Sequence, residues 1–473
     1  MVIEDVLLRG IEKLKIPETP PNYQELLTKL FQSDNVKAAM IILSPNSPTD
    51  DIGRYLHWDK LRHLPSPVGK TSEERWLGIK TARNALYKTL PFKDKKGASF
   101  KFATTDTILK NLHWLDKFSA GNITTDSSLS GILSGSNEQR SYHFKMLVDE
   151  ATFSSQMEGA ATTRMAAKEM LYARRSPKDK SEQMIYNNYN AMRFVLDHKN
   201  DPLTPSIILE LHKILTLNTL DNPSSAGQYR QSDDILVHDA RDHEVLHMPP
   251  PAGNLPQLME EYCTFANSKE SSPFIHPVVR AIILHFMLAY NHPFDDGNGR
   301  TARAVFYWSV INSHCWLMEY VSISSVIKRA LGQYARSFLY TETDDNDVTY
   351  FILHQLDIMR KAIDELFLYL REKSVEIHNA EVFLNSNIQL RTKLNFRQMS
   401  LLRNALKHPG RVYTIAGHQT YHNVAYESAR KDLLELSDTL FLFDKLKSGK
   451  AYIFVAPQDL EKRMKDGQHG KRD

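Results

Sequence analysis

Apolar residues recur at intervals of three and four over most of the chain beyond residue 136. That spacing places them on one face of a helix, so each such segment is a predicted amphipathic helix. Two apolar runs, residues 276–292 and 298–314, flank a short polar stretch. The other predicted helices cover residues 137–173, 181–199, 204–220 and 254–268. We therefore expect a mainly α fold with a helical domain at residues 137–375.

Two regions depart from this pattern. Between Gly227 and Pro251, two short alternating runs flank the polar segment DARDHE, which predicts a β-hairpin standing alone among helices. Residues 1–136 are punctuated by proline and glycine, as in PETPPNY and LPFKDKKGASF. A loop-rich, mostly helical N-terminal region is expected there.

The pattern changes again near residue 380. Residues 380–460 are predicted to run helix, turn, short helix, turn, helix and two strands joined by KLKSGKA, the order of a winged helix-turn-helix. In the third helix, the residues expected to face the core are Ala429, Leu433 and Leu436. Those available to a nucleic-acid duplex are Tyr426, Ser428, Arg430 and Lys431. Winged helices also bind proteins, so a DNA partner and a protein partner both stay open. Residues 461–473 are expected to be a frayed polar tail.

Composition excludes several classes of protein. The chain has 473 residues, enough for two or three domains, and its 42% hydrophobic and 24% charged residues are ordinary for a globular protein. A net charge of +3 favours no particular partner, and two cysteines cannot build a disulfide framework or a zinc cluster. No apolar run approaches the roughly 20 residues of a membrane span, and no signal peptide is recognisable. We expect a cytoplasmic protein that does not enter membranes.

The polar stretch HPFDDGNGRTAR, residues 292–303, carries the candidate chemistry. Pro293 favours an extended conformation at His292, where the preceding helix should give way to a loop. Gly297 and Gly299 can take positive φ, and with Asn298 they allow successive N–H groups to point into one concavity. The next helix begins there, and its N-terminus favours negative charge. This arrangement predicts a site for phosphate groups.

Charged side chains complete the predicted site. Arg300 and Arg303 are three residues apart, hence on one helical face, and their forked donors can reach over the concavity to phosphate oxygens. Asp296 would be repelled by phosphate unless a divalent cation lay between them, and Mg²⁺ is commonly held by one carboxylate and phosphate oxygens. His292 has the ordinary pKa of a general base, about 6.5. A plain helix-to-helix turn explains one of the glycines but not the whole set.

These residues resemble the signature of the Fic family, His-x-Phe-x-Asp/Glu-Gly-Asn-Gly-Arg-x-x-Arg, at every fixed position, with Phe294 expected to pack into the core. The segments IHPVVRAIILHFMLAYNHPF, LHKILT and GQYR also resemble the family. The resemblance implies a Fic-type helical domain that transfers AMP from ATP, with Mg²⁺, onto a Ser, Thr or Tyr hydroxyl of a target protein. His292 would be the general base. Doc-type members that phosphorylate instead tend to carry lysine at the place of Gly299, so nucleotidyl transfer is favoured. Asp295 occupies a variable position and receives no role.

A second segment, SSQMEG at residues 154–159, resembles the inhibitory motif of the same family through Ser154, Glu158 and Gly159. In that family the glutamate pairs with the second arginine of the signature and occupies the room of the γ-phosphate. Here the pair would be Glu158 with Arg303. A solvated helix glutamate is the alternative, and the downstream signature favours inhibition. Because the segment lies in the same chain, no separate antitoxin would be needed.

The resemblance also suggests where substrates would lie. The hairpin is similar to a flap that holds the target chain beside the histidine, with candidates Ile235, Leu236, Val237 and His238. A plain surface hairpin is the alternative. Tyr334 resembles a tyrosine that lines the nucleotide-base pocket. Two other functions stay open: removal of AMP from a modified protein, with Glu158 orienting water, and a DNA-binding regulator whose Fic domain senses a ligand. The target, the preferred nucleotide and the oligomeric state, a homodimer included, also stay open.

Overall fold

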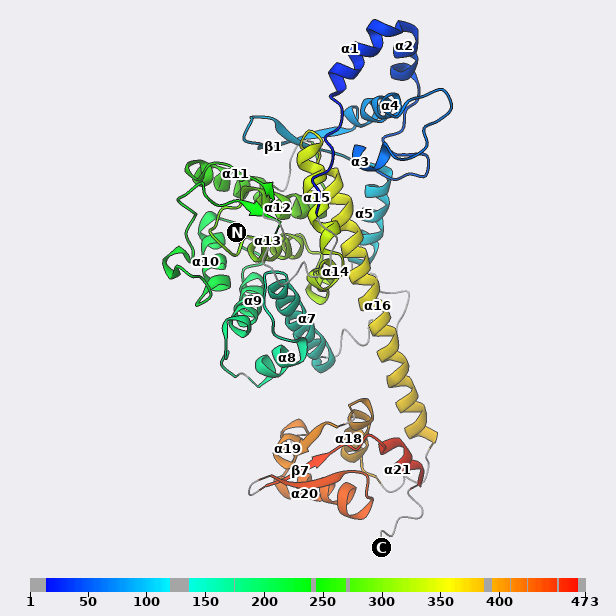
Figure 1. The fold of residues 1–473 in the computed structure, drawn as a ribbon. Coiled ribbons are helices and arrows are strands. Elements are labelled where there is room, and N and C mark those ends of the chain that lie inside the picture. Colours follow the sequence, from blue (N-terminus) through cyan, green and yellow to red (C-terminus); the bar gives the residue numbers. More distant parts are fainter. Residues whose placement is uncertain are drawn as a thin grey trace. The chain divides into compact units, whose positions relative to one another are not determined.

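The computed structural model describes residues 14–119, 136–173, 175–239, 244–268, 273–386, 394–408, 410–422, 424–448 and 451–466. The chain divides into two compact units, Met1–Leu366 and Phe367–Asp473 (Figure 1). Helices predominate among the described residues, as predicted, and the described strands form three small antiparallel sheets. No helix in these ranges combines the length and the apolar composition that crossing a membrane needs.

The centre of the first unit is a pair of helices that pack against each other, α12 (Pro277–Asn291) and α13 (Asn298–Asn312). Both are buried along almost their whole length, which explains why their apolar runs are so long. Around them lie α7 (Ser136–Gln156), α8 (Arg164–Tyr172), α9 (Lys180–Asp197), α10 (Pro205–Thr216) and α11 (Leu255–Asn267). The predicted helix over 137–173 is thus split in two, because Gly159 takes φ 96° and Thr163 caps α8.

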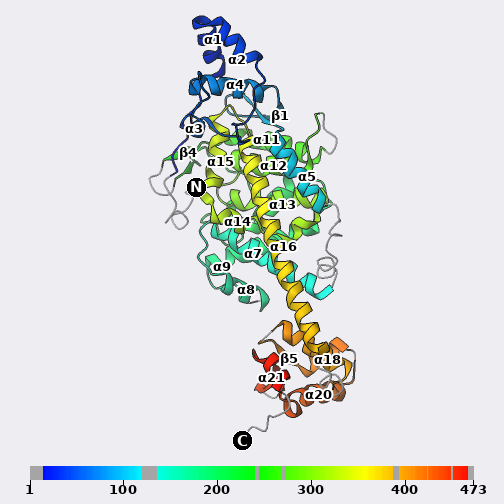
Figure 2. The same cartoon turned by 90° about the vertical axis from the view of Figure 1, so that its right-hand side faces the viewer.

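The rest of the first unit packs around α15 (Leu331–Thr343) and the start of α16 (Thr349–Ser386). Its N-terminal helices are α1 (Tyr23–Ser33), α2 (Asn35–Leu43), α3 (Trp58–Leu61), α4 (Ser72–Asn84) and α5 (Asp106–Ser119). The remaining helical turns are Pro223–Ser225, Ala252–Asn254, Trp316–Tyr320 and α14 (Ile323–Arg329). A buried ion pair between Lys80 and Asp344, at 2.7 Å, links α4 to the end of α15. Figure 1 and Figure 2 show α1 and α2 at one end of this unit and α8 at the other.

One hairpin of the first unit was not anticipated. Strands β1 (Tyr87–Lys93) and β2 (Ser99–Ala103) pair antiparallel, with Leu90, Phe92 and Phe100 buried on one face. This segment contains Pro91 and a lysine- and glycine-rich turn, which interrupt the alternation of apolar residues that would predict strands. A register shift between Thr89 and Lys93 accommodates the proline.

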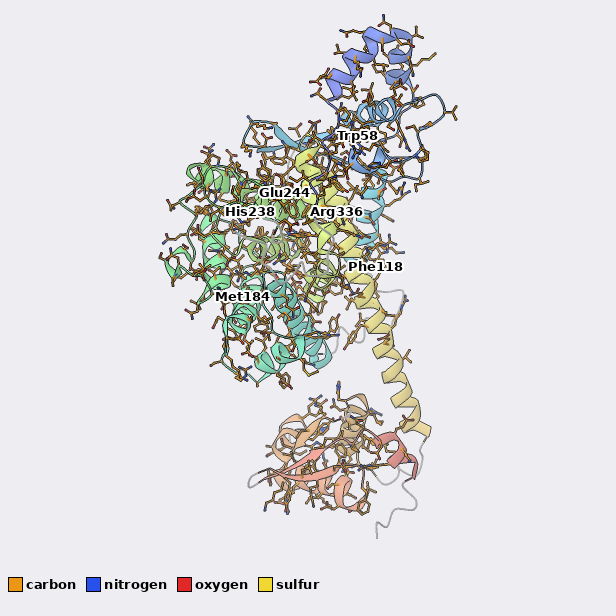
Figure 3. The ribbon with its side chains drawn as sticks, viewed as in Figure 1. Trp58, Phe118, Met184, His238, Glu244 and Arg336 are labelled. Carbon is orange, nitrogen blue, oxygen red and sulfur yellow. The ribbon has the colours of Figure 1, made fainter. Side chains whose placement is uncertain are left out.

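The predicted hairpin between Gly227 and Pro251 is present as an isolated two-stranded sheet of β3 (Val237–His238) and β4 (Val245–His247). Its strands are short, so the candidates Ile235 and Leu236 precede β3 and only Val237 and His238 lie within it. All four are partly buried. Figure 3 labels His238 and Glu244, which flank residues 240–243, outside the described ranges.

The second unit is built on a three-stranded antiparallel sheet in the order β5-β7-β6. Its elements are α18 (Phe396–Lys407), β5 (Val412–Thr414), α19 (Ile415–His422), α20 (Tyr426–Leu434), a π-helical turn (Glu435–Thr439), β6 (Asp444–Ser448), β7 (Ala451–Val455) and α21 (Leu460–Asp466). The three residues expected in the core, Ala429, Leu433 and Leu436, are fully buried. Tyr426, Arg430 and Lys431 are exposed and Ser428 is partly buried, as the helical pattern of α20 predicts.

Three details of the second unit differ from the prediction. A third strand, β5, pairs with β7. Most of KLKSGKA belongs to β6 rather than to a connection. The start of the expected tail folds as α21, because Leu460 and Met464 pack into the core of this unit. The remainder of that tail, residues 467–473, lies outside the described residues.

Candidate active site

His292 ends helix α12 in an uncommon backbone conformation. Its N–H donates to the carbonyl oxygen of Leu288 at 3.0 Å, and its φ of 45° and ψ of 57° are left-handed. The extended conformation expected before Pro293 is therefore wrong, although the helix does give way to a loop at His292. A residue distant in sequence contacts this bend, since Nε of Arg230 donates to the carbonyl oxygen of His292 at 2.9 Å.

The ring of His292 is only 5% exposed and has one free nitrogen. Nδ1 lies 3.4 Å from the carbonyl oxygen of Ala289, and because a carbonyl only accepts, Nδ1 carries the proton. Nε2 is buried without a hydrogen-bond partner in the described part of the chain. Burial, together with the charges of His247 and Arg230, lowers the pKa of His292 to about 3. The ring is therefore neutral at pH 7, with its lone pair on Nε2.

The loop after His292 is held from within. Phe294 is fully buried, as predicted, and stacks on the ring of His212 at a centroid distance of 3.7 Å. The Asn298 side chain accepts from the N–H of Phe294 at 2.9 Å and donates to its carbonyl oxygen at 2.8 Å. The amide group of Asn298 thus holds the loop, while its backbone N–H, at the start of α13, can meet an anion.

His212 on α10 is a site residue that the sequence did not single out. Its Nδ1 accepts from the N–H of Gly227 at 3.0 Å, so Nε2 carries the proton and donates to the carbonyl oxygen of Asp296 at 2.9 Å. Burial lowers the pKa of His212 to about 4. A neutral histidine therefore fixes the loop from behind, and the signal for it, a histidine within an amphipathic helix, is too common to be specific.

Protonation of His212 should destabilise the first unit in acid. The folded-state pKa lies below the unfolded value of about 6.5, so its contribution is complete above pH 6.5 and is lost as pH falls toward 4. Between pH 7 and pH 5 this residue should account for a fall of about 2 kcal/mol in the free energy of unfolding. Denaturant unfolding of wild type and His212→Gln at both pH values measures that share. An unchanged pH dependence in the variant would contradict a buried neutral His212.

The two glycines serve different needs. Gly297 has φ 84°, precedes α13, and leaves no room for a side chain because a Cβ would lie 2.9 Å from Cγ2 of Thr216. Gly299 lies in the first turn of α13 without positive φ, so the expectation of positive φ is wrong for this residue. Its requirement is space, since a Cβ there would overlap Oε1 of Glu158. The first N–H groups of α13 have no acceptor within the helix and can meet an anion.

The two arginines of the stretch turn to different partners rather than converging over the loop. Arg300 is buried and donates to the carbonyl oxygen of Leu215 at 3.2 Å and to Oδ2 of Asp296 at 3.3 Å. Arg303 points to α7 instead. Two residues on one helical face can diverge in this way because each side chain follows the polar groups of a different neighbouring helix.

Asp296 is the candidate metal ligand. Its side chain is 38% exposed, with Oδ1 near the N–H of Gly297 and Oδ2 near Arg300. The described residues contain no group of three or more His, Cys, Asp or Glu side chains that could hold a metal ion. A single, partly exposed carboxylate fits Mg²⁺, which takes one or two carboxylates and completes its shell with phosphate oxygens and water.

The predicted pair of Glu158 and Arg303 is present. Nη2 of Arg303 donates to Oε1 of Glu158 at 2.9 Å and to the carbonyl oxygen of Ser154 at 3.1 Å, and Nε donates to Oγ of Ser154 at 2.9 Å. The side chains are 3% exposed for Arg303 and 15% for Glu158. Burial alone would lower the pKa of Arg303, but the Glu158 carboxylate outweighs it and the pKa is raised. Gly159 takes φ 96° directly after the glutamate.

Helix α7 is anchored one turn before Ser154 by Glu150. This fully buried carboxylate accepts from the hydroxyl of Tyr307 at 2.9 Å, the hydroxyl of Ser322 at 2.8 Å and the N–H of Ser324 at 3.1 Å. Glu150 and Ser154 are four residues apart and share a helical face. This anchor was not predictable from the sequence, because its partners come from α13 and the start of α14.

Tyr334 on α15 lies beside Arg303. Its hydroxyl is 2.9 Å from Nε2 of His285, and burial raises the pKa of Tyr334 to about 12. Its role in a nucleotide-base pocket stays a prediction, as does target docking by Ile235, Leu236, Val237 and His238.

Comparison with known proteins places this site in context. Residues 202–310 match the model of the Fic/DOC family. The protein adenylyltransferase Fic of Aedes aegypti is 39% identical over 116 residues, covering 24% of this chain and 21% of that protein. The protein adenylyltransferase Fic of Drosophila melanogaster is 33% identical over 153 residues, covering 31% and 29%. The chain thus spans less than a third of the length of these curated relatives.

Solved structures match a larger share of the chain than the sequence relatives do, but at lower sequence identity. A Fic family protein from Desulfovibrio desulfuricans G20 covers 78% of this chain and 99% of its own, at 18% identity and a TM-score of 0.48. Fic-1 from C. elegans covers 73% and 97%, at 16% identity and a TM-score of 0.43. The segment that carries His292, the loop and the start of α13 is therefore similar in sequence to the Fic/DOC family, within residues 202–310.

Proposed function

We propose that this protein is a protein adenylyltransferase, which transfers AMP from ATP to a Ser, Thr or Tyr hydroxyl of a target protein. The observation that carries the proposal is the neutral His292, whose Nε2 has no hydrogen-bond partner among the described residues. The loop that follows His292 leads to the first N–H groups of α13, which have no acceptor within the helix. A base and an anion site in one loop suit attack of a hydroxyl on a phosphate. The names of the sequence relatives support the same reaction.

In the proposed reaction the target hydroxyl gives its proton to Nε2 of His292 while its oxygen attacks the α-phosphorus. The bond between that phosphorus and the oxygen bridging to the β-phosphate breaks, and pyrophosphate leaves. The N–H groups of Gly299 and its neighbours, with Arg300, would hold the phosphate charge. Asp296 would hold Mg²⁺, which withdraws charge from phosphate oxygens when bound. Bound polyphosphate would also oppose the lowering of the His292 pKa, since a nearby negative charge favours imidazolium.

We further propose that Glu158 inhibits the reaction. Its carboxylate occupies Arg303 and the space above Gly299, where a γ-phosphate would otherwise pair with the guanidinium. A like charge at this place weakens ATP binding or leaves ATP in an unproductive pose. The anchor at Glu150 and the bonds of Ser154 hold α7 in the inhibiting position.

The experiment that tests the function is mass spectrometry of a cell lysate treated with the Glu158→Gly variant and ATP. We expect peptides that gain the mass of AMP on a serine, threonine or tyrosine. Lysate treated with wild type should show far less, and addition of phosphate alone would contradict the proposal. The modified targets are then incubated with wild type without ATP. Loss of AMP that requires Glu158 would indicate a removal reaction, and retention of AMP would indicate simple inhibition.

A second proposal concerns the second unit, which we interpret as a winged helix that binds a nucleic-acid duplex. The order of α18, α19 and α20 followed by β6 and β7 supports it, with Tyr426, Arg430 and Lys431 exposed on α20. Binding of a generic duplex should weaken steeply with salt, because phosphate contacts release counterions. Absence of any duplex shift at low salt would favour the protein-contact alternative.

A further inference from the structure

Arg230 is a fully buried arginine whose polar contacts all lie around His292 and the hairpin. Its Nε donates to the carbonyl oxygen of His292 at 2.9 Å, and its backbone N–H donates to that of Pro293 at 2.9 Å. Its side chain is 0% exposed, so each of these bonds is made away from water. The sequence placed Arg230 in a family-like segment, GQYR, without giving it a role.

The same guanidinium closes the base of the hairpin. Nη1 donates to the carbonyl oxygen of Ser232 at 2.8 Å and lies 3.3 Å from Oδ1 of Asp233, both before β3. Nη2 donates to the carbonyl oxygen of Pro250, after β4. One planar group therefore joins the two legs of the hairpin to the main chain of His292, a geometry that the single ammonium group of lysine cannot reproduce.

The backbone of His292 needs this support. A left-handed conformation outside glycine costs of order 1 kcal/mol, although histidine tolerates it better than most residues. The conformation decides the direction in which the ring leaves the main chain, and so where Nε2 lies. Two hydrogen bonds from Arg230 hold both sides of that bend: side-chain Nε donates to the carbonyl oxygen of His292, and the backbone N–H donates to that of Pro293.

The hairpin contacts the end of α12 at a second point. His247 on β4 has Nε2 2.7 Å from the carbonyl oxygen of Tyr290 and Nδ1 2.7 Å from Oε2 of Glu342 on α15. The hairpin thus contacts the main chain at Tyr290 through His247 and at His292 through Arg230. Both residues bear on the ring of His292 electrostatically as well.

We propose that Arg230 is a positioning residue: it couples the hairpin to His292, so that a target strand held by the hairpin meets Nε2 at the correct place. This rests on the proposed function for the identity of the reaction and on the predicted docking of the target at the hairpin. Arg230 touches neither nucleotide phosphates nor the hydroxyl in this scheme and acts through the backbone of His292. Its removal should therefore affect the rate of transfer much more than the binding of ATP.

The test compares Arg230→Lys with Arg83→Lys in the Glu158→Gly background. Arg83 is a matched control, since it is also fully buried in the first unit and donates to the carbonyl oxygens of Pro48 and Leu56. Arg230→Lys should lower kcat by about 100-fold with KM for ATP changed less than about 3-fold, because displacing a base by an ångström has that effect. Arg83→Lys should leave kcat within about 2-fold. Equal losses of kcat in the two variants would overturn the proposal.

Two further measurements keep the outcome decisive. Asp233→Asn leaves Arg230 in place and removes the negative charge beside its guanidinium, so it should also lower kcat, by a smaller factor. This variant tests the proposal even if Arg230→Lys does not fold. NMR of histidine-labelled protein, with His292 assigned by its loss in His292→Ala, should show the ring signals of His292 shifted in Arg230→Lys and unchanged in Arg83→Lys. Unshifted signals in Arg230→Lys contradict the coupling. If no variant transfers AMP, the proposed function fails while the ring signals still decide the role of Arg230.

Discussion

Replacing Glu158 by glycine is expected to raise auto-modification from labelled ATP by about 100-fold. The change removes the acceptor to which Nη2 of Arg303 donates at 2.9 Å, leaving one N–H of that group for a new partner, and clears the space above Gly299. A buried arginine left without an anionic partner costs several kcal/mol of free energy. The γ-phosphate of ATP would take the place of the Glu158 carboxylate as that partner. The measurement is the initial rate of label incorporation at fixed ATP concentration.

A matched control is Glu182→Gly. Glu182, on α9 of the first unit, is buried and pairs with Arg175 at 2.8 Å, much as Glu158 pairs with Arg303. Its loss should destabilise the unit without activating transfer. If wild type and Glu158→Gly label at the same rate, the pair with Arg303 has no inhibitory role.

Replacing His292 by alanine should lower transfer by at least about 1,000-fold, in wild type and in the Glu158→Gly background alike. Nε2 of His292 is the buried, unpartnered nitrogen positioned to take the hydroxyl proton, and a general base contributes about 100- to 10,000-fold. The affinity for ATP, measured by calorimetry in the Glu158→Gly background, should change little, because in the proposed site α13 rather than His292 would hold the phosphates. Loss of ATP binding together with activity would indicate a structural role instead.

His198→Ala provides the comparison for this second prediction. His198 also caps a helix, α9, and its Nδ1 lies 2.9 Å from the carbonyl oxygen of Phe194. It lies outside the candidate site, so its removal should leave the rate of transfer unchanged. Any general effect of deleting a helix-capping histidine would appear in both variants.

The helices between residues 137 and 312 were predictable from the sequence because each of them buries residues along at least one face. The apolar run at 276–292 became α12 (Pro277–Asn291), one residue shorter at each end, since full burial leaves a continuous signal. The backbone of His292 was not predictable, because it departs from the local preference set by Pro293 and contacts Arg230, 62 residues earlier. Contacts between distant segments leave no periodic trace in a sequence.

The candidate site shows the same division. The residues of the loop could be named from their chemistry, yet the reason for Gly299 lies in the turn after α7, where Glu158 fills the space that a Cβ would need. Arg300 and Arg303 share a helical face, as their spacing requires, but turn to α10 and α7. His212 and Glu150 escaped notice because single polar residues in amphipathic helices are ordinarily structural, and only their partners reveal what they hold.

The central claim, nucleotidyl rather than phosphoryl transfer under the control of Glu158, is tested most directly by the position of the label. The Glu158→Gly variant should be incubated in parallel with ATP labelled at the α-phosphate and ATP labelled at the γ-phosphate. We expect the target protein to acquire the α-label and no γ-label. With His292→Ala in the same background, it should acquire neither. Incorporation of the γ-label, or of the α-label without dependence on His292, would contradict the central claim.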